Sequence, residues 1–150
     1  MANLLTVIIV DENEVFRTGL KQIIGTTNQA VALECADNTT SFTSLLHYVQ
    51  PGLIFLRVKK NAPEDMELIA DVTSRYPLTK IITLYEVAEE SFVQQLFHQK
   101  VQGIVHKNAY AREFLAALDA VVQDGLYYCQ QTLKLLASSA SYTKKSLPVP

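Results

Sequence analysis

Cysteine and glycine are scarce in this sequence: two of the 150 residues are cysteine and five are glycine. Cys35 and Cys129 are too few for a disulfide framework, and a reducing cytoplasm is the simplest setting for them. The sequence contains no glycine-rich phosphate loop, no GxSxG motif and no CxxC motif. The enzyme classes that depend on these motifs are not indicated, and we expect a protein that is not an enzyme.

Long hydrophobic runs and an excess of one charge are also absent. The run LLTVIIV is too short to span a bilayer, and acidic residues follow it directly. The basic start and the small-residue cleavage site of a signal peptide are missing. The formal net charge of −2 gives no electrostatic reason to expect nucleic acid or a membrane as partner. We expect a cytoplasmic protein without membrane contact.

Short apolar runs alternate with longer amphipathic stretches, and 150 residues at 49% hydrophobic suit one compact domain with a full core. Runs such as VIIV, LIFL and IITL are apolar at every position, which is typical of strands buried on both faces of a parallel sheet. The predicted strands are Leu5–Val10, Ala30–Cys35, Leu53–Val58, Lys80–Leu84 and Gly103–His106.

Apolar residues at helical spacing follow each of these strands. The predicted helices are Glu14–Ile24, Ser41–Val49, Asp65–Tyr76, Glu90–His98 and Tyr110–Gln123. Asn13 is a candidate cap for the first helix, Pro77 stops the third and Gly125 stops the fifth. The alternation predicts an α/β fold, a (βα)5 doubly wound parallel five-stranded sheet of flavodoxin-like order.

The composition changes after residue 125, so we predict one domain over residues 1–125 and a different segment over residues 126–150. Regularly spaced leucines predict one more short helix, Gln130–Ala137. The following SSASYTKKSLPVP is rich in Ser, Lys and Pro and lacks an apolar face. We expect a linker or tail there.

Four stretches carry ordered motifs of one known family. VIIVDENEVFRTGLKQII is similar to the opening of a response-regulator receiver domain, and PGLIFLRVKKNAPEDMEL to its third strand and loop. KIITLYEVAEE and QGIVHKNAYAREFLAAL resemble its fourth and fifth strands with their helices. The resemblance runs from Leu5 to Leu136 and is to the NarL/FixJ subgroup of this CheY-like family. It implies a two-component, phosphorelay-type transcriptional regulator.

The resemblance assigns roles to residues at the carboxyl ends of the strands, where function gathers in an open parallel sheet. Asp11 and Glu12 match the acidic pair that holds Mg²⁺ in the family, and Lys107 matches the lysine that contacts the phosphoryl group. Arg57 stands where the family has its phosphoacceptor aspartate.

Other family positions differ as well. Tyr85 replaces the Ser or Thr that ends the fourth strand, and Ile104 replaces the aromatic switch residue of the fifth. Lys60-Asn61 stands in place of Met-Pro, and Asp65 in place of Gly. The sequence leaves open whether Tyr85 packs under the following loop or gates a partner.

The formal charges of the predicted pocket cancel, because Asp11 and Glu12 face Arg57 and Lys107. A conventional pocket has a carboxylate surplus that a divalent cation neutralises. We therefore expect a self-neutralised ion-pair cluster without Mg²⁺ or another cofactor; a metal would need Arg57 to point away. The alternative for Arg57 is a structural cap that contacts no ligand.

The sequence favours a regulatory module that signals by protein interaction, most simply homodimerisation, without phosphorylation at the usual position. DNA contact would require an output domain beyond these residues, and the sequence leaves open whether a sensor kinase is a partner. We expect a constitutive interaction face on the fourth helix, fifth strand and fifth helix. Its predicted residues are Phe97, Gln99, Lys100, Ile104, Arg112 and Glu113.

Two other functions are compatible with the sequence. The first is a phosphorelay receiver that accepts the phosphoryl group on another carboxylate, such as Asp11 or Asp65, although an acceptor must lie between the metal and the lysine. The second is a sensor of a small anion that binds Arg57 and Lys107.

Overall fold

The computed structural model describes residues 4–36 and 40–146. Its elements are β1 (Leu5–Val10), α1 (Glu14–Gly25), β2 (Ala30–Cys35), α2 (Thr40–Val49), β3 (Leu53–Arg57), α3 (Pro63–Arg75), β4 (Lys80–Tyr85), α4 (Glu90–Phe97), β5 (Gly103–His106), α5 (Ala111–Val122), β6 (Tyr127–Tyr128) and α6 (Gln130–Ser146). The strands pair in parallel in the order β2-β1-β3-β4-β5-β6. The predicted doubly wound fold is confirmed, with one short edge strand added to the five expected.

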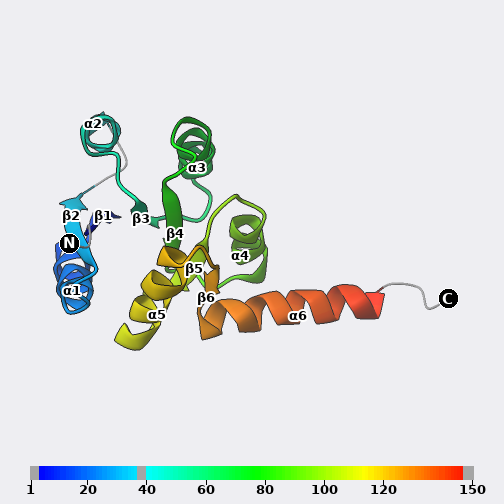
Figure 1. Ribbon diagram of the computed structural model, residues 1–150. Coiled ribbons are helices and arrows are strands. Elements are labelled where there is room, and N and C mark those ends of the chain that lie inside the picture. The colour runs from blue at the N-terminus through cyan, green and yellow to red at the C-terminus, as the bar shows by residue number, and fades with distance from the viewer. Residues whose placement is uncertain (1–3, 37–39, 147–150) are drawn as a thin grey trace.

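Helices cover both faces of this sheet (Figure 1). The helices α1 and α5 pack on one face, and α2, α3 and α4 on the other. Along β1, Val7 and Ile9 point into the first layer of core, whereas Ile8 and Val10 point into the second. This burial on two sides explains why the strands are apolar at every position.

The helix ends follow local chemistry. The side chain of Asn13 caps α1 by accepting a hydrogen bond of 3.0 Å from the Phe16 N–H, as predicted. The helix α5 ends at Val122, and the residue that adopts the left-handed conformation is Asp124, with φ 64°, instead of Gly125. Gly125 is needed for space, because a Cβ there would lie 3.0 Å from the Ala120 carbonyl oxygen.

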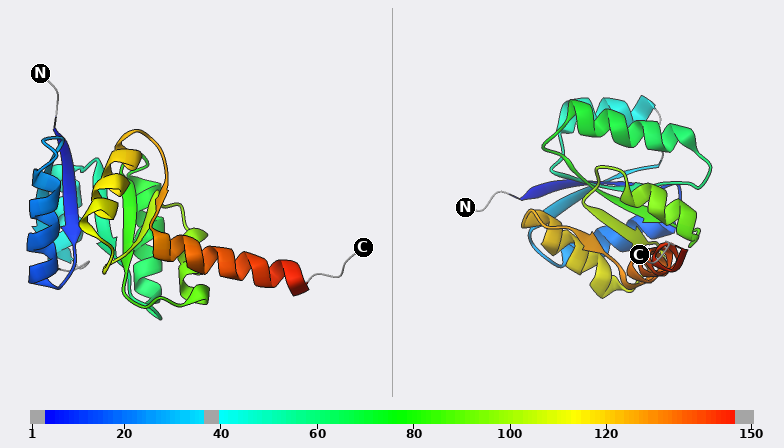
Figure 2. Two further views of the ribbon diagram at one scale, coloured as in Figure 1. Left: turned by 90° about the horizontal axis from the view of Figure 1, so that it is seen from below. Right: turned by 90° about the vertical axis from the view of Figure 1, so that its right-hand side faces the viewer.

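The segment after α5 is more ordered than the sequence predicts. Tyr127 and Tyr128 form β6 beside Gly103 and Ile104 of β5. The helix α6 runs from Gln130 to Ser146, beyond the expected end at Ala137, and extends away from the sheet (Figure 2). Its first turns pack against the core, and a helix once nucleated propagates through residues that are neither Gly nor Pro. Within the described ranges, no helix is long and apolar enough to cross a membrane.

Candidate functional site

The carboxyl ends of β1 and β5 bring Asp11 and Lys107 together. The Lys107 ammonium lies 2.7 Å from Asp11 Oδ2, and the other carboxylate oxygen accepts a hydrogen bond of 2.8 Å from the Asn13 N–H. Asp11 is fully buried, and only 8% of the Lys107 side chain is exposed. The same ammonium lies 4.7 Å from the centre of the Phe16 ring. Asp11 Oδ1 is thus hydrogen-bonded, whereas Oδ2 is ion-paired with Lys107 but is not hydrogen-bonded within the described residues; the lysine also lies against an aromatic face.

Lys107 has a second carboxylate partner that the sequence did not single out. It donates a hydrogen bond of 3.0 Å to Glu86 Oε1, from the loop after β4. This bond, together with the charge of Lys107, lowers the pKa of Glu86 below its ordinary value of 4.5. The sequence signal for this role of Glu86 was its position just after the predicted fourth strand, at the edge of the sheet where functional residues gather.

Arg57, at the end of β3, is buried but poorly paired. Its Nη1 lies 3.8 Å from Glu12 Oε1, too far for a hydrogen bond, and Lys59 lies 3.5 Å from the same oxygen. The Arg57 side chain is 7% exposed, whereas that of Glu12 is 63% exposed. The Nε and Nη1 of Arg57 are buried and have no hydrogen-bond acceptor among the described residues. The four predicted pocket charges therefore gather at one edge, but as two unequal pairs.

A cavity of about 300 Å³ opens beside Arg57. Its lining residues are Glu12, Arg57, Val58, Lys59, Lys60, Glu86 and Val87. Asp65 holds the backbone of one lining residue in place, because its buried carboxylate accepts a hydrogen bond of 2.9 Å from the Lys59 N–H. Within the described part of the chain, no three His, Cys, Asp or Glu side chains gather as a metal-binding group.

Tyr85 lies outside this cavity, which corrects the placement expected from the sequence. Its fully buried side chain points toward α6, where the hydroxyl donates a hydrogen bond of 2.9 Å to Thr132 Oγ1. The Thr132 hydroxyl in turn donates to the Ile104 carbonyl oxygen at 2.9 Å. Burial raises the pKa of the Tyr85 hydroxyl far above its usual value. Tyr85 therefore neither lines the pocket nor meets solvent, and it joins β4 to α6.

Comparisons with known proteins agree with this fold. No family model matches the chain. The transcriptional regulatory protein DegU of Brevibacillus brevis is 23% identical over 125 residues, which cover 83% of this chain and 53% of DegU. The oxygen regulatory protein NreC of Staphylococcus aureus is 25% identical over 126 residues, 82% of this chain and 57% of NreC. The chain resembles the receiver part of response regulators of the NarL/FixJ type. It spans about half the length of the curated relatives that it matches.

Solved receiver-domain structures share the fold of this chain. The isolated receiver domain of RcsB from Salmonella enterica serovar Typhimurium superposes with a TM-score of 0.81 at 17% identity, over 89% of this chain and 99% of that one. A LuxR-family response regulator from Aurantimonas sp. SI85-9A1 gives a TM-score of 0.82 at 14% identity, over 93% and 99% of the two chains. At these identities the likeness establishes the fold.

The predicted interaction face is partly covered by the chain itself. Ile104 is fully buried, so it contributes no contact surface. Phe97 is 42% exposed, but its ring packs at 5.7 Å against Tyr128 of β6. Glu113 accepts a hydrogen bond of 2.9 Å from the Gln130 N–H at the start of α6. Arg112 remains exposed, with its guanidinium 4.4 Å from the centre of the Tyr110 ring.

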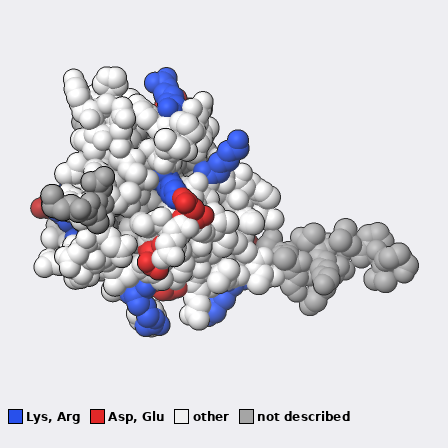
Figure 3. Space-filling view, in the orientation of Figure 1, with Lys and Arg blue, Asp and Glu red and all other residues white. Residues whose placement is uncertain are grey.

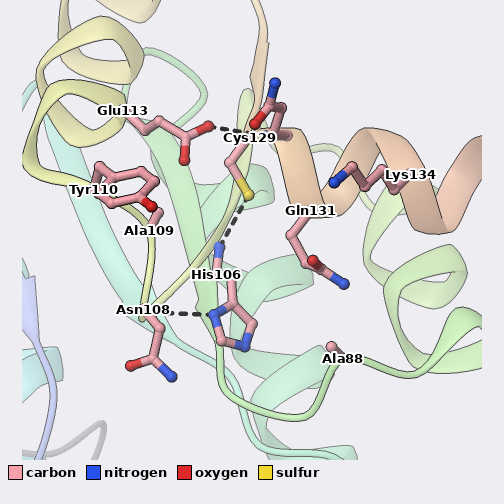
Figure 4. A pocket seen from close by; sticks show the side chains of 10 residues that line it. Ala88, His106, Asn108, Ala109, Tyr110, Glu113, Cys129, Gln131 and Lys134 are labelled. Carbon is pink, nitrogen blue, oxygen red and sulfur yellow. Dashed lines mark hydrogen bonds between the residues drawn. The ribbon is translucent and has the colours of Figure 1, made fainter.

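A second hollow, of about 400 Å³, lies between the β5–α5 loop and the start of α6 (Figure 4). His106 and Cys129 both line this hollow, and the backbone N–H of His106 donates a hydrogen bond of 3.3 Å to the buried sulfur of Cys129. The Asn108 N–H donates to His106 Nδ1 at 3.0 Å, so that nitrogen is the unprotonated one in this arrangement. These contacts anchor α6, and Cys129 serves as a small core residue.

Charged side chains of both signs are scattered over the face that Figure 3 shows. Lysine and arginine lie there beside aspartate and glutamate, instead of forming a patch of one sign. The mixed pattern agrees with the small net charge of −2. The described residues on this face form no basic stripe of the kind by which nucleic-acid-binding surfaces are recognised.

Proposed function

We propose that this receiver domain is a binding module that signals without accepting a phosphoryl group at the end of β3. The observation that carries the proposal is the presence of Arg57 at this position, because a guanidinium cannot form an acyl phosphate. Asp11 and Glu12 are the family's acidic pair, and here each has a cation within 4 Å: Lys107 at 2.7 Å from Asp11 and Arg57 at 3.8 Å from Glu12. Attraction between these charges supports a pocket that is stable in one state.

The other carboxylates are poor substitutes as acceptors. Asp11 is fully buried and both of its oxygens are engaged, by Lys107 and by the Asn13 N–H. Asp65 is 3% exposed and bonded to the Lys59 N–H. A nucleophile must be free to approach the phosphoryl donor in line, and neither group is. These contacts favour the binding module over a receiver phosphorylated at a different carboxylate.

The donor set also fits Mg²⁺ poorly. Mg²⁺ requires several oxygen ligands in octahedral geometry. Asp11 is bonded to an ammonium, Glu12 is largely exposed, and the third carboxylate of the family is the cation Arg57. The proposed binding function requires neither a metal ion nor another cofactor.

Assembly is the mode of signalling that the relatives suggest. One of the similar structures contains two RcsB dimers bound to two parallel DNAs, at 17% identity and a TM-score of 0.81. For this chain we propose homodimerisation through the part of the α4–β5–α5 face that stays exposed, including Lys100 and Arg112. DNA contact would belong to an output domain, since DegU and NreC are each nearly twice as long as the matched region.

The proposal is tested by incubating the chain with acetyl phosphate and Mg²⁺ and measuring its intact mass. We expect no added phosphoryl group in the wild-type chain. The variant Arg57→Asp is the positive control, because it puts the family's acceptor aspartate back at this position and a phosphoryl group can then be attached. A stoichiometric phosphoryl adduct on the wild-type chain, mapped to Asp11 or Asp65, would refute the proposal.

A further inference from the structure

The guanidinium of Arg57 has hydrogen-bond donors that nothing in the described chain uses. Its Nε and Nη1 are buried without an acceptor, and the nearest carboxylate oxygen, on Glu12, lies 3.8 Å from Nη1. Buried guanidinium donors are costly when they are unpaired, because they have lost water and gained no acceptor in exchange. The side chain is 7% exposed, so bulk solvent does not satisfy it fully.

The neighbouring cations are better satisfied. Lys107 is held between Asp11 and Glu86, at 2.7 and 3.0 Å. Lys60 is paired with Glu89. Of the described cations around this cavity, Arg57 is the one with buried donors left over, and those donors form a planar fork that matches two oxygens of one oxyanion.

The cavity beside this fork is positive in balance. Three cations line its volume of about 300 Å³, Arg57, Lys59 and Lys60, against the two carboxylates of Glu12 and Glu86. Glu86 is paired with Lys107 and Lys60 with Glu89, which leaves Arg57 and Lys59 against Glu12. The side chain of Glu12 is 63% exposed and not hydrogen-bonded to Arg57, so it can swing into solvent when an anion enters.

We propose that this cavity binds a phosphate group noncovalently, with two oxygens on the Nε–Nη1 fork of Arg57 and the ammonium group of Lys59 at the rim. Arg57 and Lys59, opposed inside the cavity by the exposed Glu12 alone, favour a doubly charged phosphate over a singly charged carboxylate. Lys107, which the sequence suggested as the second anion ligand, is excluded by its two carboxylate partners. The inference rests on the proposed function, because it requires that Arg57 takes no covalent phosphoryl group.

The test is an NMR titration that follows the Arg57 Nε–H signal of the whole chain at constant ionic strength. The probes are inorganic phosphate, glycerol 3-phosphate and acetate, and the first two distinguish a free ion from a phosphate carried on an organic molecule. We expect a saturable shift with at least one phosphate probe and a weaker one with acetate. Glu12→Gln should tighten phosphate binding roughly fivefold, since it removes a like charge close to the bound anion.

Two methionine variants provide the matched comparison. Arg57→Met should abolish the saturable shifts of the cavity amides, whereas Arg75→Met, at an exposed arginine at the other end of α3, should keep them. A flat titration of the wild-type chain with both phosphate probes overturns the inference, as does equal binding by Arg57→Met. Intact mass after a separate incubation with acetyl phosphate and Mg²⁺ separates the two ideas: an unchanged mass with a flat titration removes the anion site alone, and a covalent adduct removes the proposed function.

Discussion

Replacing Thr132 by valine tests the bond that joins β4 to α6. The side chain keeps nearly the same volume and loses the hydroxyl, which accepts from Tyr85 and donates to the Ile104 carbonyl, at 2.9 Å in each case. The Ile104 carbonyl keeps the Cys129 N–H at 3.2 Å, so the group left stranded is the fully buried Tyr85 hydroxyl. A buried polar group without a partner costs ~2 kcal/mol. We expect Thr132→Val to lower the free energy of unfolding by that amount.

The companion variant Tyr85→Phe should cost less. It removes the donor, while the Thr132 hydroxyl still bonds the Ile104 carbonyl and contacts the Cys129 sulfur at 3.1 Å. We expect a loss of ~1 kcal/mol, typical of one hydrogen bond without a stranded partner. The double variant should lose less than the sum of the two, because no hydroxyl is then left unpaired.

The assay is urea unfolding followed by circular dichroism, with hydrogen exchange of the α6 amides as a local reporter. Thr73→Val is the matched control, since its hydroxyl makes a 3.0 Å bond to Ala70 near the surface. We expect that control to change stability by less than ~0.5 kcal/mol. The reasoning is refuted if Thr132→Val costs no more than Thr73→Val, or if α6 exchange is unchanged while stability falls.

The remaining predictions concern the pocket and the dimer. Millimolar Mg²⁺ or Mn²⁺ should leave the melting temperature unchanged; a saturable increase would show that the acidic pair still binds metal. Arg57→Asp should gain affinity for Mg²⁺, measured by calorimetry, but should remain a poor phosphoryl acceptor, measured by intact mass after incubation with acetyl phosphate. The lowered pKa of Glu86 means that its pair with Lys107 stabilises the fold above pH 4.5 and is lost as pH falls through the folded-state value, so Glu86→Gln should match the wild-type stability at low pH and fall below it at pH 7. Sedimentation should show a concentration-dependent dimer that Arg112→Glu weakens; monomers throughout would move the interface elsewhere.

The sheet was predictable because burial on two faces leaves a strong sequence signal. All five predicted strands exist, and two of them differ by one residue at an end, at Val58 and Tyr85. The strand β6 was not predicted because two tyrosines form no apolar run, and their pairing with β5 depends on where α5 ends. The full length of α6 was missed for a related reason: the serines and lysines that extend it have no apolar face, and the packed first turns start the helix.

The sequence predicted which charged residues meet at this edge, but not which of them pair, and it wrongly placed Tyr85 in the pocket. Strand order places Asp11, Arg57 and Lys107 at one edge, which a motif can reveal. Which cation reaches which carboxylate depends on side-chain reach across that edge, so the position of Glu86 after the fourth strand marked it as a candidate but did not predict its bond to Lys107. The direction of the Tyr85 side chain could likewise not be predicted from the sequence, since a residue at the end of a strand can point toward the edge of the sheet or into the helix layer that packs on it.

The ends of β4 and β5 are tied together on both sides of the backbone. The Lys107 N–H donates to the Tyr85 carbonyl at 2.9 Å, and His106 Nε2 donates to the Glu86 carbonyl at 3.0 Å, given that its other nitrogen accepts. On the pocket side, the Lys107 ammonium holds Glu86; on the other side, the Tyr85 ring packs edge-on against His106 at 5.0 Å and its hydroxyl holds Thr132. Moving this strand end would therefore break an ion pair and a buried hydrogen bond together. Such a coupled cost favours one fixed arrangement over a switch between two, which is the behaviour required of a module that signals without phosphorylation.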